Sequence, residues 1–264
     1  MQSNSFKIFV SVLALFITIL ACAPFGGGSS GSTQPAPTLQ SAQFPSTQAT
    51  DTPAPASSGG GKYFQEDFSG NLNNWKQFVI NASKFPDTPP QLVKDTFGKM
   101  SVGVKDDYLV FDLESKGQWA YAIYDPQEYD DVRIDASIEN RNTNSNNVSL
   151  ICRYSPDEGW YEFSIENTGK YEVYYGQVES DGTTLIYSKL LDGAYSKFKT
   201  GKNTNEIGFS CVGRTLTLYI NGNQLKQYDD NQYVLKKGKI GISASSFTDP
   251  PALIGFDWVK VSQP

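Results

Sequence analysis

Residues 205–228 read NEIGFSCVGRTLTLYINGNQLKQY, and this stretch carries the clearest structural signal in the chain. Apolar and polar residues alternate in the runs on both sides of Asn221-Gly222, which is typical of half-buried β-strands. Asn-Gly between two such runs favours a type I′ turn, because both central residues need a positive φ. Gly213-Arg214 separates the first run from the second in a similar way. The stretch therefore predicts a three-stranded antiparallel meander.

Short alternating runs continue on both sides of this meander, with turn residues between them. The runs span 63–68, 99–104, 108–114, 119–124, 132–139, 148–154, 160–166, 170–178, 184–188, 239–244 and 254–261. Long stretches with the period of a helix are missing. So many short strands, in about 200 residues, predict one all-β domain over 62–264, built as a two-sheet antiparallel β-sandwich or jelly roll.

The first 22 residues have the pattern of a signal peptide. An apolar run from Ile8 to Ala21 follows Lys7 and ends at Cys22. This run is shorter than the roughly 20 residues that span a bilayer, and it has the length of a signal-peptide apolar region. The ending ILAC (19–22) resembles the lipobox of bacterial lipoproteins, which implies cleavage before Cys22 and acylation of that cysteine. The alternative is an ordinary signal peptide in which the cysteine is incidental.

The lipoprotein interpretation predicts a protein that a lipid anchors to the extracytoplasmic face of a bacterial cell membrane. Residues 23–61 are rich in Gly, Ser, Thr, Pro, Gln and Ala and contain one charge, Asp51. Such a segment cannot bury an apolar face, so it is predicted to be a disordered, flexible linker. The domain would then be joined to the membrane only through the anchor at Cys22.

The charge and the lack of histidine exclude several functions. The formal net charge is −6 and no basic run is present, which argues against nucleic acid as a partner. With 0 histidines, the chain cannot form a Ser-His-Asp or Cys-His nucleophile arrangement or most catalytic zinc sites. Any catalysis would depend on carboxylates, Tyr, Lys or Arg.

A metal site would need a hard, oxygen-ligated ion such as calcium. Asp106-Asp107 and Asp130-Asp131 supply carboxylates, but neither pair has the ligand spacing of a calcium loop. Both pairs are interpreted as turn residues. The sequence therefore predicts no metal site and no cofactor, with calcium as the alternative.

Cys152 and Cys211 remain as an even pair in a chain that is predicted to be exported to an oxidising compartment. Alternation places Cys152 on one strand face with Leu150, and Cys211 on one strand face with Phe209. Both cysteines are therefore expected to point into the core. A disulfide between them is predicted, and two buried free thiols are the alternative.

Alternation also predicts the positions of the other aromatic residues. Trp119 and Tyr121 share a strand face with Ile123, which is typical of core residues. Trp75 and Trp258 are interpreted as packing residues near the two ends of the domain.

Five segments in order form the pattern of a known family. They are VSLICRYSPDEGWYEFSI (148–165), GKYEVYYG (169–176), NEIGFSCVGRTLTLYINGNQL (205–225), GKIGISA (238–244) and IGFDWVKV (254–261). Together they resemble a concanavalin A-like (laminin-G-like) jelly roll, and especially the extracytoplasmic modules of bacterial lipoproteins and receptor ectodomains. The resemblance implies two curved sheets with a concave face that often binds glycans. The superfamily also contains glycoside hydrolases and structural modules, so the fold leaves the function open.

Two glutamates in WYEFSIEN (160–167) raise the question of catalysis. Laminarinases and lichenases, which share this architecture, carry Glu-X-Asp-X-Glu on a strand. Glu162 and Glu166 match the outer positions of that pattern, but Ser164 stands in the middle. A retaining mechanism needs the carboxyls about 5 Å apart with separated pKa values, and a serine does little to hold two glutamates in that state. A glycoside hydrolase that uses Glu162 and Glu166 is therefore an alternative, and a solvated strand face is the simpler interpretation.

A third interpretation is a sugar-binding surface, in which flat aromatic rings lie beside hydrogen-bonding groups. If consecutive strands pair, one non-core face would carry Arg153, Trp160, Glu162, Glu172 and Tyr174. A cross-strand ladder of ion pairs would give the same pattern. Non-catalytic binding of a polysaccharide or cell-surface glycan is the predicted function. A protein-interaction or structural module is the remaining alternative.

Overall fold

The computed structural model describes residues 61–81, 91–92, 100–142, 145–178 and 185–264. The predicted signal peptide (1–22), and all of the predicted linker (23–61) except Gly61, lie outside the described residues. The described part contains sixteen strands and no helix, so it includes no apolar helix that could cross a membrane. The prediction of an all-β domain is confirmed.

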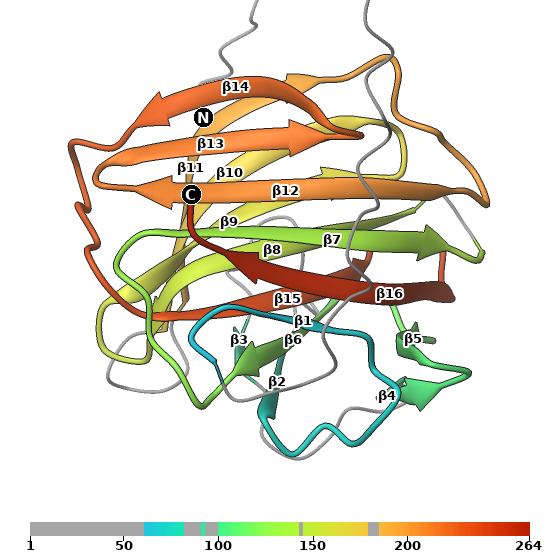
Figure 1. Cartoon of the computed structure of the whole chain (residues 1–264). Helices are drawn as coiled ribbons and strands as arrows, with labels where there is room; N and C mark the ends of the chain where they lie inside the picture. Colours follow the sequence, from blue (N-terminus) through green and yellow to red (C-terminus); the bar gives the residue numbers. More distant parts are fainter. Residues whose placement is uncertain (1–60, 82–90, 93–99, 143–144, 179–184) are drawn as a thin grey trace, which may run out of the picture. The chain divides into compact units, whose positions relative to one another are not determined.

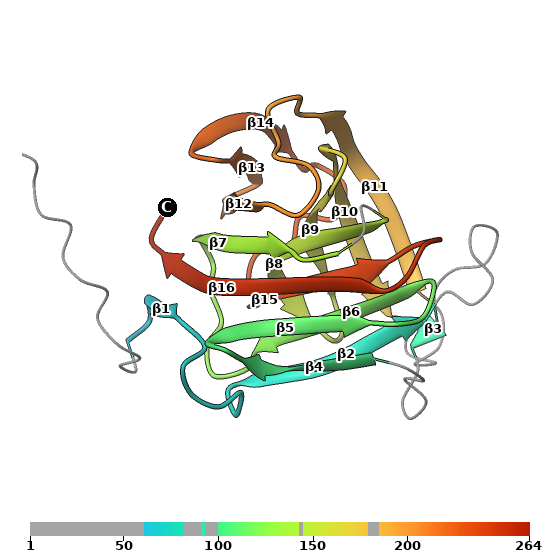
Figure 2. The same cartoon turned by 90° about the vertical axis from the view of Figure 1, so that its right-hand side faces the viewer.

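The strands form two eight-stranded sheets in which all neighbours are antiparallel (Figures 1 and 2). Sheet A contains, in spatial order, β14 (Asn223–Asp229), β13 (Thr215–Ile220), β12 (Thr204–Val212), β7 (Val132–Asn140), β16 (Ala252–Ser262), β5 (Tyr108–Leu113) and β4 (Met100–Lys105), with β1 (Phe64–Glu66) paired to β16. Sheet B contains β11 (Leu185–Ala194), β10 (Lys170–Val178), β9 (Gly159–Glu166), β8 (Asn146–Ser155), β15 (Lys239–Ser246), β6 (Gln118–Tyr124), β2 (Trp75–Asn81) and β3 (Gln91–Leu92). The two sheets lie face to face as a sandwich, as predicted.

The predicted meander is present as β12, β13 and β14. Asn221 and Gly222 have φ values of 49° and 75°, which agrees with the type I′ turn expected from Asn-Gly. Asp106 and Asp107 form the turn between β4 and β5 with φ values of 54° and 59°. The interpretation of Asp106-Asp107 as turn residues is therefore correct.

The core between the sheets contains the strand faces that alternation assigned to it. Tyr161, Phe163 and Ile165 of β9 are each at most 1% exposed, and they pack with the inward residues of sheet A. Cys152 of β8 and Cys211 of β12 form a disulfide, with their Cα atoms 6.7 Å apart. This bond joins the two sheets covalently, and the predicted pairing is confirmed.

Strand β2 was not predicted, because buried apolar residues lie on both of its faces. Trp75 and Val79 pack into the core between the sheets, whereas Phe78 and Ile80 pack on the outer face of sheet B. A strand that is buried on both sides lacks the apolar–polar alternation by which the other strands were recognised. The expectation that Trp75 packs near one end of the domain is met, since it is 4% exposed.

Reduction of the Cys152–Cys211 bond is expected to lower the free energy of unfolding by about 4 kcal/mol. The bond spans a sequence separation of 59 residues, and opening a loop of that length restores entropy to the unfolded chain. Guanidinium unfolding with and without dithiothreitol measures the difference. A Cys152→Ala/Cys211→Ala double variant should not respond to the reductant. Equal midpoints for the oxidised and reduced wild type would refute this role of the disulfide.

Candidate functional site

A second buried cluster covers the outer face of sheet B. It consists of Ile80, Trp119, Tyr121, Ile123, Ile151 and Trp160, with Phe78, Tyr154, Val178, Tyr187 and Phe247 packed against them. The predicted burial of Trp119, Tyr121 and Ile123 is therefore correct. They lie in this outer cluster, however, and the small side chains of Ala120 and Ala122 occupy the inward face of β6.

Aromatic rings hold this outer cluster together. Phe78 stacks on Tyr121 with ring centroids 4.6 Å apart, and Tyr154 lies 5.7 Å from Phe78. Trp160 meets Tyr121 edge to face at 5.8 Å. Such arrangements suit the ring quadrupoles and add to the gain from burial. Trp160 is only 1% exposed, so the prediction that it lies on an open surface is wrong.

Glu162 lies beneath these rings and is 0% exposed. Its Oε2 accepts hydrogen bonds from Trp160 Nε1 at 3.0 Å and from the Tyr121 hydroxyl at 3.3 Å. Burial raises the pKa of the Glu162 carboxyl, and contacts with Trp160, Ser149, Tyr187 and Tyr121 oppose that rise. The expectation that Glu162 faces solvent is wrong, because side chains from neighbouring strands close over it.

The two glutamates of WYEFSIEN lie in different surroundings. Glu166 is half-buried near the end of β9, and its carboxylate accepts a hydrogen bond from Thr168 Oγ1 at 3.0 Å. Between them, Ser164 accepts one from Asn147 Nδ2 at 2.6 Å. Residues four apart in a strand are separated by about 13 Å at Cα. The contacts thus hold Glu162 and Glu166 in separate networks and do not gather them as a catalytic pair.

Arg153 does not lie on the face of sheet B that the sequence predicted. Its φ is 55°, and the register between β8 and β9 shifts between Cys152 and Ser155. This bulge interrupts the alternation and turns the side chain toward the end of the sandwich. Arg153 is 1% exposed, so its assignment to a surface with Trp160 and Glu162 is wrong.

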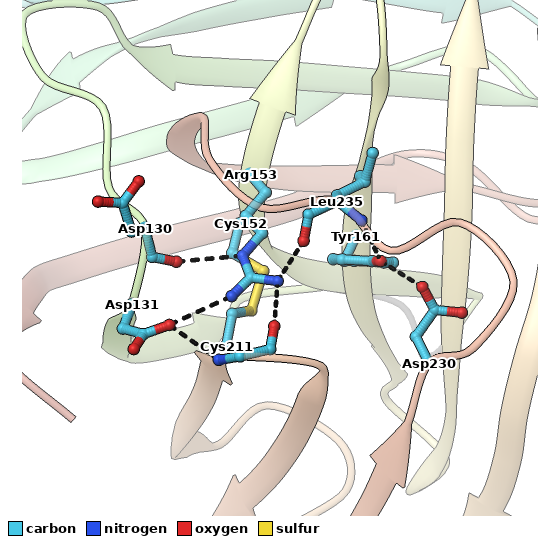
Figure 3. The surroundings of a disulfide bond; sticks show 9 residues. Asp130, Asp131, Cys152, Arg153, Tyr161, Cys211, Asp230 and Leu235 are labelled. Atoms are coloured by element: carbon cyan, nitrogen blue, oxygen red, sulfur yellow. Dashed lines mark hydrogen bonds and ion pairs between the residues drawn. A yellow bond between two sulfur atoms is a disulfide. The ribbon is translucent and has the colours of Figure 1, made fainter.

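The Arg153 guanidinium joins three loops beside the disulfide (Figure 3). Its Nε donates to the carbonyl oxygen of Asp130 at 3.1 Å. Its Nη1 donates to the carbonyl oxygen of Gly213 at 2.6 Å and also to that of Leu235. Its Nη2 lies 3.4 Å from Asp131 Oδ1. Burial lowers the pKa of Arg153. The Arg153 side chain is therefore held by hydrogen bonds inside the protein and does not lie on its surface.

Asp230 holds the loop that supplies Leu235 to Arg153 (Figure 3). The Tyr161 hydroxyl donates to Asp230 Oδ2 at 2.5 Å and accepts from the backbone N–H of Leu235 at 2.9 Å. Burial works against the ionised form of Asp230, but the Tyr161 hydroxyl and three backbone amides outweigh it and lower its pKa. The carboxylate therefore stays charged and organises the turn that follows β14.

The described residues contain no group of three or more Cys, Asp or Glu side chains that could hold a metal ion. Asp130 uses its carbonyl oxygen for Arg153, and Asp131 Oδ1 accepts the backbone N–H of Gly213 at 2.8 Å. These contacts account for the Asp130-Asp131 pair as part of the loop before β7.

Glu172 and Tyr174 do lie together on an accessible surface. The Tyr174 hydroxyl donates to Glu172, and the Tyr174 ring stacks on Tyr187 with centroids 4.3 Å apart. Lys189 Nζ lies 3.5 Å from Glu172 Oε1 and 3.6 Å from Asp192 Oδ1. Burial, and then the bond to Glu172, raise the pKa of Tyr174, so its hydroxyl stays a donor. We call these five residues the β10–β11 patch.

Sequence reasoning missed three of the five patch residues, namely Tyr187, Lys189 and Asp192. Residues 184–188 were recognised as a strand, and alternation alone puts Tyr187 and Lys189 on one face. Only the pairing of β11 with β10 shows that this face is the one that carries Tyr174, which is the direct partner of Lys189.

The Glu162→Gln variant is expected to be less sensitive to rising pH than the wild type. The folded protein keeps Glu162 protonated to a higher pH than the unfolded chain does. The wild type therefore loses stability as the pH rises from the ordinary glutamate pKa through the raised one, by at most about 1.4 kcal/mol per pH unit. Glutamine retains the acceptor for Trp160 but does not ionise. Urea unfolding between pH 4 and 8 measures the effect, and parallel pH profiles would contradict a raised pKa.

The fold of the chain is shared with solved sugar-active proteins. A Bacillus licheniformis beta-glucanase matches with 13% identity and a TM-score of 0.52, over 78% of this chain and 100% of that chain. A glycoside hydrolase family 16 endo-glucanase from Bacteroides ovatus matches with 14% identity and a TM-score of 0.51, over 75% and 99% of the two chains. The carbohydrate binding module CBM66 from Bacillus subtilis has 12% identity and a TM-score of 0.45, over 60% and 88%. The two glucanase matches confirm the predicted concanavalin A-like jelly roll as the fold of this chain.

Among curated proteins, none matches the sequence significantly. A family model does match it, over residues 63–259, and its description is the 3-keto-alpha-glucoside-1,2-lyase-like domain. The match begins one residue before β1 and ends within β16. The chain therefore belongs to the family of 3-keto-alpha-glucoside-1,2-lyase-like domains.

Proposed function

We propose that the protein is a non-catalytic carbohydrate-binding module whose ligand is a polysaccharide or a cell-surface glycan. The β10–β11 patch is the observation that carries this proposal. It presents the half-buried ring of Tyr174 beside the carboxylates of Glu172 and Asp192 and the ammonium of Lys189. An aromatic ring suits the apolar C–H face of a pyranose, and charged groups bind its hydroxyls well. The patch combines both on one strand pair.

Two features favour binding over hydrolysis. The Glu162 carboxyl is closed off from solvent by the outer cluster, so a sugar at the surface does not reach it. Glu166 is held by Thr168 in a separate network. The description of the family refers to an alpha-glucoside, which supports glucosyl units as the sugar that this chain would bind.

Tyr174→Ala is expected to weaken glycan binding about tenfold, because it removes the ring that would stack on the sugar and the donor to Glu172. The assay incubates the full chain with a panel of plant, fungal and bacterial polysaccharides. It measures both the protein depleted from solution and the reducing ends released. Tyr63→Ala serves as the matched control, because Tyr63 is an exposed tyrosine (36%) outside the patch.

The same assay separates the alternatives. Depletion without new reducing ends, lost in Tyr174→Ala, supports the binding module. Reducing ends that disappear in Glu162→Gln would instead establish a hydrolase. If no polysaccharide depletes the protein, the carbohydrate proposal fails and a protein partner becomes the better hypothesis.

We also propose that acyl chains on Cys22 hold the protein at the extracytoplasmic face of a bacterial cell membrane. The support is the apolar run before Cys22 and its lipobox-like ending. Cells that express the full chain should incorporate an alkyne-tagged fatty acid into it, and Cys22→Ser should abolish both this label and recovery of the protein in the membrane fraction. Equal labelling of the wild type and the variant would exclude Cys22 as the lipidation site.

A further inference from the structure

The outer face of sheet A carries a hollow of about 160 Å³, on the opposite side of the sandwich from the β10–β11 patch. Its walls include Arg133, Asp135, Glu206, Tyr219, Trp258 and Lys260. One ordered water needs roughly 10–15 Å³ of such space, so the hollow has room for a group as large as a sugar ring. We infer that this hollow is a second sugar-binding site, which takes a single neutral glucosyl ring. The inference rests on the proposed carbohydrate-binding function and extends it to sheet A.

A glycine lines the hollow in the middle of a cross-strand row. Lys260, Asp135, Gly208 and Tyr219 are direct partners across β16, β7, β12 and β13. A Cβ on Gly208 would lie 2.4 Å from Asp135 Oδ1 and 3.1 Å from Tyr219 Cβ. No side chain therefore fits at Gly208 without displacing both neighbours. The missing side chain lets the Asp135 carboxylate lie close over Gly208, which itself lines the hollow.

The polar wall of the hollow is organised before any ligand arrives. The Arg133 guanidinium lies 3.9 Å from the centre of the Tyr219 ring. Its Nε and Nη2 donate to the two carboxylate oxygens of Asp135 at 2.8 Å and 2.9 Å. The hydrogen bond to Asp135 raises the pKa of Arg133. A bidentate pair stacked on a ring has few alternative rotamers, so ligand binding would lose little side-chain entropy.

The charges around the hollow favour a neutral, polyhydroxylated ligand. Arg133 and Lys260 supply two positive charges, and Asp135 and Glu206 supply two negative ones. An anionic or cationic ligand would meet an unfavourable charge, whereas sugar hydroxyls both donate and accept hydrogen bonds. Tyr219 and Trp258 add aromatic carbon to the walls, which suits the C–H face of a sugar.

Trp258 gives the hollow its own spectroscopic probe. It is half-buried, whereas the other three of the four tryptophans, Trp75, Trp119 and Trp160, are at most 8% exposed. The expectation that Trp258 is simply a packing residue is therefore incomplete, because part of its indole lines the hollow. A sugar bound there should shield Trp258 from a quencher in solution.

The test measures acrylamide quenching of tryptophan fluorescence in the full chain, with maltotriose, cellotriose and laminaritriose as probes. At least one trisaccharide should reduce quenching, and Tyr219→Ala should weaken that protection about tenfold. Glu206→Gln and Lys260→Gln should also weaken it. These two residues are exposed, so their replacement tests the site without disturbing packed rings. Tyr63→Ala, at a residue that does not line the hollow, should leave the protection unchanged.

Three outcomes distinguish this inference from the proposed function. Protection that depends on Tyr219, Glu206 and Lys260 supports the second site. Polysaccharide depletion that depends on Tyr174, without any protection of Trp258, would leave the proposed function intact and overturn the second site. If neither depletion nor protection occurs, both proposals fall.

Discussion

The central strands of sheet B have no solvent-facing side, and much of the structure depends on this constraint. Along β9, Tyr161 and Phe163 pack into the core between the sheets, while Trp160 and Glu162 pack into the outer cluster, and all four are at most 1% exposed. A slip of one residue would exchange the two sets and put a carboxyl into the apolar core. The register of β9 against β8 and β10 is therefore determined from both sides.

Polar groups that are buried at the end of the sandwich also need hydrogen-bond partners within the protein. Arg153 donates hydrogen bonds to carbonyl oxygens in loops outside the strand ladders. Asp230 accepts hydrogen bonds from the Tyr161 hydroxyl and from nearby backbone amides. The disulfide between Cys152 and Cys211 lies beside this network. Covalent and hydrogen-bonded links thus close the same end of the molecule, where an unpaired buried group would be costly.

The same constraint decides which surfaces remain for a ligand. Among the described residues, three groups bear on where a ligand could bind: the buried Glu162, the β10–β11 patch and the hollow over Gly208. Glu162 has the raised pKa that often marks a functional carboxyl, but the rings around it exclude solvent. The patch and the hollow keep aromatic rings and paired charges accessible on opposite faces. If both proposed sites bind glycans, their opposite directions would let the protein join two glycan chains and strengthen its attachment through avidity.

The sequence by itself determined the strands that have one apolar and one polar face. From these strands it predicted the meander at 205–228, the sandwich that contains it and the cysteines that face the core. Glu172 and Tyr174 were correctly brought together for the same reason. The sequence did not reveal β2, because apolar residues lie on both of its faces. It also did not reveal the direction of Arg153, because a bulge interrupts the alternation. Only the tertiary structure placed Tyr187 beside Tyr174 and formed the hollow over Gly208. Both depend on which strands become neighbours, and alternation within one strand encodes its faces but not its partners.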